Sequence, residues 1–188
     1  MFSFKQFRQL QKEEFEKSEI EIANKTSRTI GAVGAKAIVP RYVEEIESNF
    51  NNKEKRKILD FGAGKDAAHT IRLREKGFDV TAHEFGDNQK EGLHDPKALD
   101  KKYDHVYASN VLNVQSSKRM MSKTLDQIHD SLKKNGLFTA NFPTSPRKSE
   151  DIDIEYILSE LQKRFENAEI VKGFGTKQAP LFHAAIPK

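Results

Sequence analysis

Residues 57–66 constrain the fold of this chain more than any other segment. They read Lys-Ile-Leu-Asp-Phe-Gly-Ala-Gly-Lys-Asp, an apolar run that ends in a carboxylate and then in two closely spaced glycines. Such a run before a glycine turn is typical of a buried strand in a parallel sheet. Gly62 and Gly64 allow a tight turn and close approach of a ligand, and the helix expected next offers N–H groups. The segment therefore predicts a cofactor cradle.

The spacing of this turn leaves two classes of cofactor open. Gly62-x-Gly64-x-x-Ala67 satisfies the dinucleotide fingerprint, and Glu84 lies 20 residues beyond Gly64, near where a ribose-binding acid is expected. Spacing alone therefore allows a nicotinamide cofactor. However, a chain of 188 residues is too short to add a second substrate domain of ordinary size.

Charge favours the other class of cofactor. Asp60 precedes the turn and Asp66 lies within it, so a pyrophosphate would meet like charge there. S-adenosylmethionine instead brings a sulfonium and an ammonium group. Because two carboxylates suit a cationic ligand better, a nicotinamide-dependent oxidoreductase is the less favoured interpretation.

Four segments of the chain resemble the class I S-adenosylmethionine-dependent methyltransferases. The first motif of that family is an apolar strand, an acid and a glycine-rich turn. Its second strand ends in the acid that grips the ribose hydroxyls, and Glu84 takes that place here. The order of the segments also matches, so the resemblance covers residues 57–188. The matching segments are Ile58–Gly64, Phe78–Glu84, Tyr103–Leu112 and Leu132–Phe138.

The resemblance implies S-adenosylmethionine as cofactor, bound at the ends of the strands. Ser109 and Asn110 would flank its methionine moiety and the transferred methyl group. Asp95 stands where the family often has an acid or amide near the adenine, although His94-Asp95-Pro96 is equally a turn signal. Asp66 replaces a glycine that is common in the family, so the methionine end is expected to be held differently. The predicted cofactor-binding residues are Asp60, Gly62, Ala63, Gly64, Asp66, Glu84, Phe85, Asp95, Ser109 and Asn110.

No catalytic residue follows from the sequence. Amino-directed nucleic-acid methyltransferases of the family carry an Asp or Asn, two prolines and an aromatic residue after the fourth strand, where this chain has Ser109-Asn110-Val111-Leu112. Asn141-Phe142-Pro143-Thr144 is superficially similar, but it follows the fifth strand, and a strand end with a proline turn is the favoured interpretation. The six histidines show no metal-ligand spacing, so no metal is predicted. Alignment of donor and acceptor needs no obligatory base.

The segment order predicts an α/β, Rossmann-like fold with a mainly parallel sheet and helices on both faces. Residues 168–174 and 181–186 are expected to form an antiparallel hairpin at the C-terminal edge. Only 18 residues separate Glu84 from Tyr103, too few for the usual helix, strand and loop. We therefore expect a sheet trimmed between the second and fourth strands of the family.

The N-terminal region, residues 1–56, is predicted to be a helical lid or cap that forms one compact unit with the cofactor-binding domain at 57–188. An apolar stripe is expected from Phe4, Phe7, Leu10 and Phe15, and a second helix within 32–50, interrupted or begun near Pro40. Thr26, Ser27 and Arg28 either edge the mouth of the active site or only cap a helix.

Composition narrows the function and the compartment. The chain has no cysteine, which excludes disulfides, thiolate metal sites and a cysteine nucleophile. No apolar run approaches the ~20 residues needed to cross a bilayer. The first residues lack a signal-peptide core, so a cytoplasmic protein with no membrane partner is predicted.

Charge leaves the methyl acceptor open. The formal net charge of +4 permits an anionic partner without requiring one. Nucleic acid is therefore slightly favoured over a small molecule as acceptor, and the oligomeric state stays open. The predicted function is S-adenosylmethionine-dependent methyl transfer. The alternative is a noncatalytic S-adenosylmethionine-binding regulatory module, motivated by the missing base and the shortened sheet.

Overall fold

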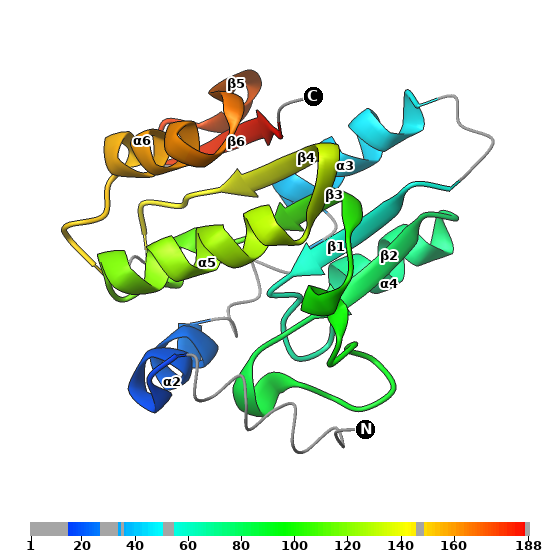
Figure 1. The fold of residues 1–188 in the computed structure, drawn as a ribbon, viewed down its shortest axis with the longest axis horizontal. Helices are drawn as coiled ribbons and strands as arrows, with labels where there is room; N and C mark the ends of the chain where they lie inside the picture. Colours follow the sequence, from blue (N-terminus) through cyan, green and yellow to red (C-terminus); the bar gives the residue numbers. More distant parts are fainter. Residues whose placement is uncertain (1–14, 27–33, 35, 51–54, 146–148, 187–188) are drawn as a thin grey trace.

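The described part of the chain forms one mixed sheet of six strands in the order β2-β1-β3-β4-β6-β5 (Figure 1). The computed structural model describes residues 15–26, 34, 36–50, 55–145 and 149–186. Strands β1 to β4 pair in parallel, and β6 pairs antiparallel with both β4 and β5. The predicted sheet with its C-terminal antiparallel edge is confirmed. The strands are β1 (Lys57–Phe61), β2 (Asp79–His83), β3 (Tyr103–Ala108), β4 (Leu132–Asn141), β5 (Glu166–Thr176) and β6 (Ala179–Ala185).

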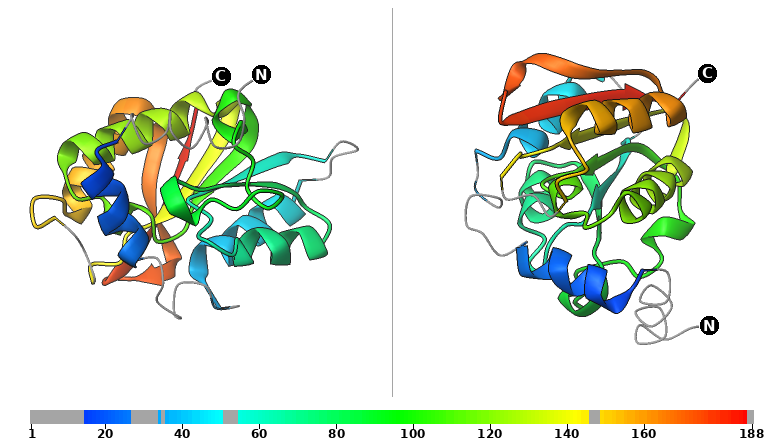
Figure 2. Two further views of the ribbon diagram at one scale, coloured as in Figure 1. Left: turned by 90° about the horizontal axis from the view of Figure 1, so that it is seen from below. Right: turned by 90° about the vertical axis from the view of Figure 1, so that its left-hand side faces the viewer.

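Helices cover both faces of the sheet, as Figure 2 shows. Helices α5 (Lys118–Asp130) and α6 (Ile154–Arg164) lie on one face, and α3 (Ile38–Ser48) and α4 (Ala68–Glu75) lie on the other. Because side chains alternate along a strand, β1 contributes to two cores. Leu59 and Phe61 pack in the cluster with residues of α5 and α6, whereas Ile58 packs with residues of α3 and α4.

The sheet stops at β2, as expected for a trimmed fold. Between β2 and β3 the chain forms only two short 3-10 helices, η2 (Gly86–Asn88) and η3 (Ala98–Asp100). The free edge of β2 is partly blocked, because two of its carbonyl groups already accept hydrogen bonds. Arg74 Nε donates to the carbonyl of Val80 at 2.7 Å, and the backbone N–H of Asp95 donates to the carbonyl of Ala82 at 2.9 Å. Occupied edge carbonyls oppose pairing with a further strand.

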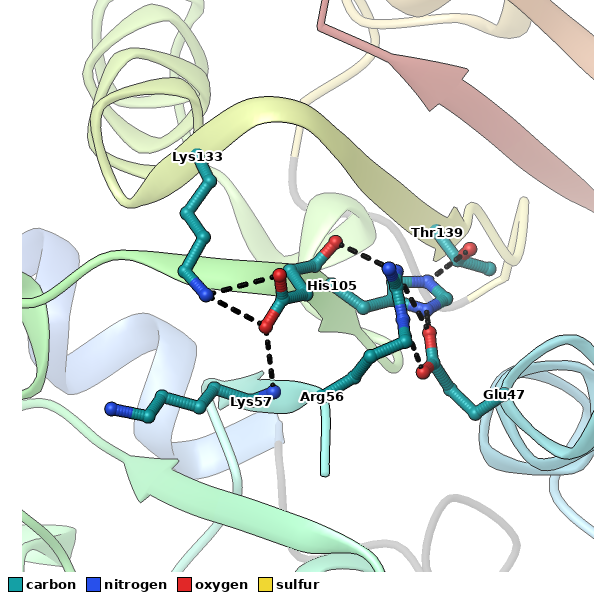
Figure 3. A network of polar contacts seen from close by, with 7 residues as sticks. Glu47, Arg56, Lys57, His105, Lys133 and Thr139 are labelled. Carbon is teal, nitrogen blue, oxygen red and sulfur yellow. Dashed lines mark hydrogen bonds and ion pairs between the residues drawn. The ribbon is translucent and has the colours of Figure 1, made fainter. Parts of the chain in front are cut away.

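A buried polar network fixes α3 to the start of the sheet (Figure 3). The Glu47 carboxylate accepts from Arg56 Nε at 2.7 Å and contacts His105 Nδ1 at 2.8 Å, and His105 Nε2 lies 2.9 Å from Thr139 Oγ1. Although burial opposes ionisation, the hydrogen bonds from His105 and Arg56 hold the pKa of Glu47 below its usual value. His105 and Thr139 have no exposed surface, so this chain of acid, imidazole and hydroxyl serves the structure.

Helix α2 (Lys17–Thr26) is anchored to the beginning of α5. Glu19 accepts from Ser117 Oγ at 3.1 Å and from Arg119 Nη2 at 2.6 Å. Phe15 and Ile20 pack against Met120 beside these polar contacts. Negative charge near the first turn of α5 is also favourable for that helix.

Several N-terminal predictions fall outside the described residues. They concern Phe4, Phe7, Leu10, Ser27, Arg28 and the side chain of Thr26. Helix α3 begins at Ile38, so Pro40 lies in its first turn, where a proline is tolerated. Among the described residues, no helix combines the length and the apolar character needed to cross a bilayer.

Candidate functional site

A pocket opens at the carboxyl ends of β1, β2 and β3, and α2 forms its outer wall. It encloses about 770 Å³ of empty space, solvent at its mouth included. Ligand pockets typically lie at this end of open α/β sheets. Seven of the ten residues predicted from the sequence line it, namely Gly62, Ala63, Gly64, Glu84, Phe85, Ser109 and Asn110.

The backbone of the glycine turn is bound to the end of β2. The N–H groups of Gly62 and Ala63 donate to the carbonyl of His83 at 3.0 and 2.8 Å, and that of Gly64 donates to Glu84 Oε2 at 2.5 Å. These three donors are therefore already engaged by the protein. A pyrophosphate, which depends on turn amides of this kind, would find them occupied.

Glycine is required at position 62 by both conformation and space. Gly62 has φ +75°, and a Cβ built there would lie 2.6 Å from Cγ2 of Val111. Gly64 has φ +74° with no heavy atom within 4 Å of such a Cβ, leaving out its neighbours in the chain. The turn is therefore packed at Gly62 and open at Gly64, which lets a ligand reach the backbone there.

His94 supports the turn from the loop that replaces the missing strand. Its Nδ1 accepts from the backbone N–H of Lys90 at 2.9 Å, so the neutral ring carries its proton on Nε2. Nε2 then donates to the carbonyl of Gly64 at 2.9 Å. Burial lowers the pKa of His94, which favours this neutral form. No sequence pattern predicted this supporting role of His94.

Glu84 places a carboxylate in the pocket wall in a buried setting. Its Oε2 accepts from Gly64 and its Oε1 accepts from the backbone N–H of Phe85 at 2.8 Å. Burial raises the pKa of Glu84 to about 7, against these two hydrogen bonds and with a smaller contribution from the charge of Asp60. A carboxylate offers about four lone-pair sites, so about two remain for hydroxyl donors.

Three predicted carboxylates do not line the pocket. Asp60 faces the α3 and α4 side of β1, where it has no exposed surface and accepts from Thr70 Oγ1 at 2.8 Å. Burial raises the pKa of Asp60. Asp66 is exposed and pairs with Lys90 at 2.5 Å. Asp95 closes a turn by accepting from the backbone N–H of Lys97 at 2.9 Å, the alternative that the sequence had left open.

Ser109 and Asn110 follow β3 and border the pocket together. The Ser109 hydroxyl is buried and has no hydrogen-bond partner among the described residues. Asn110 has φ +59° and is bound by Asn141 at the end of β4. With Glu84 and the open face of Gly64, these groups fit a ligand that carries ribose hydroxyls at one end and polar groups at the other.

The sequence did not identify the wall opposite the turn. Ile20, Ala23 and Asn24 of α2 line the pocket, although the helix itself had been expected. In the same wall, Gln115 and Thr124 form a buried pair, because Thr124 Oγ1 donates to Gln115 Oε1 at 3.0 Å. His69 of α4 borders the pocket beside the turn. Within the described ranges, no cluster of three acidic or histidine side chains is placed to hold a metal ion.

Comparison with known protein families shows which kind of domain the chain contains. A family model described as a methyltransferase domain matches residues 35–170. No curated protein matches the sequence.

Solved structures show the same fold at low identity. An S-adenosylmethionine-dependent methyltransferase from Bacteroides fragilis, bound to S-adenosylhomocysteine, is 16% identical, with 77% of this chain and 76% of that chain covered and a TM-score of 0.55. A sugar N-methyltransferase from Streptoalloteichus is 12% identical, with 81% of this chain and 88% of that chain covered and a TM-score of 0.63. The magnesium protoporphyrin IX methyltransferase from Synechocystis, with bound S-adenosylhomocysteine, is 14% identical, with 96% of this chain and 99% of that chain covered and a TM-score of 0.56. At these identities the likeness establishes the fold alone.

Proposed function

The chain belongs to the class I S-adenosylmethionine-dependent methyltransferases, and on this premise we propose that it transfers a methyl group from S-adenosylmethionine to a small organic molecule. The observation that carries the choice of acceptor is the lining of the pocket. Apolar side chains dominate it, and the described lining residues include no lysine or arginine. A site for nucleic acid would need cations to neutralise phosphates.

The basic charge that favoured nucleic acid in the sequence lies outside the lining of this pocket, and part of it is paired with carboxylates. Lys101 lies 2.5 Å from Asp95, Lys133 lies 2.9 Å from Asp104, and Arg56 binds Glu47. Each pair joins one positive and one negative charge, so the net charge of +4 is unchanged while these three side chains are engaged within the protein. The pocket therefore supports a small acceptor over nucleic acid.

Three polar residues of the pocket, Glu84, Ser109 and Asn110, would contact the cofactor in this proposal. When bound, S-adenosylmethionine supplies an activated methyl group on a sulfonium. Glu84 accepts from the ribose hydroxyls, and Ser109 with Asn110 holds the methionine end. Asp60 is given no contact with the cofactor, because its buried side chain does not reach the pocket.

Rate acceleration in this proposal comes from alignment and exclusion of water. Phe15, Ile20 and Met120 form an apolar cluster between α2 and α5, and all three line the pocket. They would shield the acceptor from solvent, while Gln115 and Thr124 offer it a polar contact. No side chain is assigned as a general base.

Transfer of a labelled methyl group tests this function. Purified protein and tritium-labelled S-adenosylmethionine would be incubated with a low-molecular-mass cell extract and, separately, with RNA and DNA. We expect label in the small-molecule fraction, and less with Glu84→Ala. Label confined to nucleic acid would overturn the choice of acceptor. Cofactor binding without transfer to either fraction would favour the noncatalytic module.

A further inference from the structure

Two asparagines bind each other where β3 and β4 end. Asn141 Oδ1 accepts from the backbone N–H of Asn110 at 2.7 Å, and Asn141 Nδ2 donates to Asn110 Oδ1 at 2.9 Å. Asn110 lines the pocket, whereas Asn141 lies behind it, nearly buried. Asn141 is also the first residue of Asn141-Phe142-Pro143-Thr144, which resembles a methyltransferase motif but follows the fifth strand of the family instead of the fourth.

The first hydrogen bond fixes the orientation of both side-chain amides. A backbone N–H can only donate, so the group of Asn141 that faces it must be the oxygen. The NH2 group of Asn141 then faces Asn110, and only the oxygen of Asn110 can accept from it. The NH2 group of Asn110 is therefore the part of that amide that Asn141 leaves available.

We propose that Asn141 is a positioning residue that holds the Asn110 amide as a hydrogen-bond donor for the carboxylate of the cofactor's methionine moiety. This inference rests on the proposed function. A carboxylate needs donors, and the described lining residues include no lysine or arginine to supply them. The buried Ser109 hydroxyl, adjacent in sequence and without a partner among the described residues, provides a second donor.

The substitution Asn141→Asp separates this role from simple structural support. One oxygen of the introduced carboxylate could still accept from the Asn110 N–H, but the other would repel Asn110 Oδ1. The Asn110 amide would then turn over, so that its NH2 group donates to the carboxylate and its oxygen faces the ligand. The two hydrogen bonds between residues 110 and 141 would persist, while the amide of Asn110 would present its oxygen to the ligand in place of its NH2 group.

Calorimetric titration with S-adenosylhomocysteine and 5′-methylthioadenosine tests the proposal. The second ligand shares the adenosine and thioether but lacks the amino acid moiety. We expect Asn141→Asp to weaken S-adenosylhomocysteine at least tenfold and to leave 5′-methylthioadenosine within twofold. Asn135→Asp is the control, because it makes the same change at an exposed residue of β4, the strand that Asn141 ends. Thermal melting of each variant checks that it folds.

A double-mutant cycle with Asn110→Ala excludes a direct effect of the new charge. If the introduced carboxylate acts through Asn110, then Asn141→Asp has little further effect once Asn110 is replaced by alanine. A full further loss in the double variant, or equal weakening of both ligands by Asn141→Asp, would overturn the inference and leave the proposed function standing. Failure of the unmodified protein to bind S-adenosylhomocysteine would overturn both.

Discussion

At the scale of single residues, Glu84 connects the chemistry of the pocket to pH. Its carboxyl is buried, and its pKa is raised to about 7, so it is only partly ionised at neutral pH without ligand. Ribose hydroxyls would donate to the ionised form and thereby favour it. Cofactor binding and ionisation of Glu84 are therefore linked.

This linkage predicts that the affinity for S-adenosylmethionine falls as pH drops through 7. Between pH 8 and pH 6 the ionised fraction of a group with this pKa falls about tenfold, and the affinity should follow it. Glu84→Gln should bind more weakly at pH 8 and show little of this dependence. Calorimetry at both pH values checks this, and an unchanged pH dependence in Glu84→Gln would assign the titration to another group.

Gly62 allows a second prediction at the same scale. Gly62→Ala should lower the free energy of unfolding by about 1–3 kcal/mol more than Gly173→Ala, because only the first Cβ overlaps a neighbour, Val111. Both positions have positive φ, so backbone strain is common to the two variants. Urea unfolding measures the difference, and equal losses would show that Val111 yields without cost.

At the scale of elements, the Glu47 network determines how α3 is held. Glu47→Ala leaves His105 and Arg56 without their carboxylate in a buried setting. We expect the free energy of unfolding to fall by about 3–5 kcal/mol, as for other broken buried ion pairs. Glu45→Ala, at an exposed position of the same helix, is the control. Similar denaturation curves for the two variants would show that the network contributes little.

The elements also show what the sequence could and could not predict. The strand ends that carry Gly62, Gly64 and Glu84 were predictable, because an apolar run, a turn and a spaced acid form a local pattern. Asp60 was placed in the cradle, but strand alternation turns it toward α4. The support from His94 was not visible, because it depends on a loop folding back 30 residues along the chain.

The residues by which α2 lines the pocket could not be predicted for a similar reason. An apolar stripe indicates that a helix packs, but it does not say against what. Glu19 reaches Ser117 and Arg119, contacts across about 100 residues that no local pattern encodes. The helix was expected as a lid or cap, and that role stays a prediction, as does the compartment.

At the scale of the whole molecule, buried titratable groups set the response to acid. Burial lowers the pKa of His83 to about 3 and that of His183 to about 4. Each histidine binds a proton more readily when unfolded, so its contribution to stability is lost as pH falls below about 6.5. Glu84 acts in the opposite sense, because its raised pKa favours the folded state at low pH and that gain is lost as pH rises through 7.

We therefore predict that stability falls with acid between pH 6 and pH 4.5, because burial lowers the pKa of four histidines and raises that of only two carboxyls. The histidines are His83, His94, His105 and His183, and the carboxyls are Asp60 and Glu84. In His83→Phe the slope should decrease by about 1.4 kcal/mol per pH unit, the equivalent of one proton. The substitution also suits the site, where His83 packs between Phe61 and Phe85. Urea unfolding at several pH values measures both slopes. An identical slope in the variant would show that His83 is already protonated in the folded protein.

The central claim, that this pocket holds S-adenosylmethionine, is tested most directly by calorimetric titration with S-adenosylhomocysteine and with NADH. The carboxylate of Glu84 predicts saturable one-to-one binding of S-adenosylhomocysteine. The occupied turn amides predict no binding of NADH, because its pyrophosphate would lack donors there. Binding of NADH, or no binding of S-adenosylhomocysteine by correctly folded protein, would contradict the account.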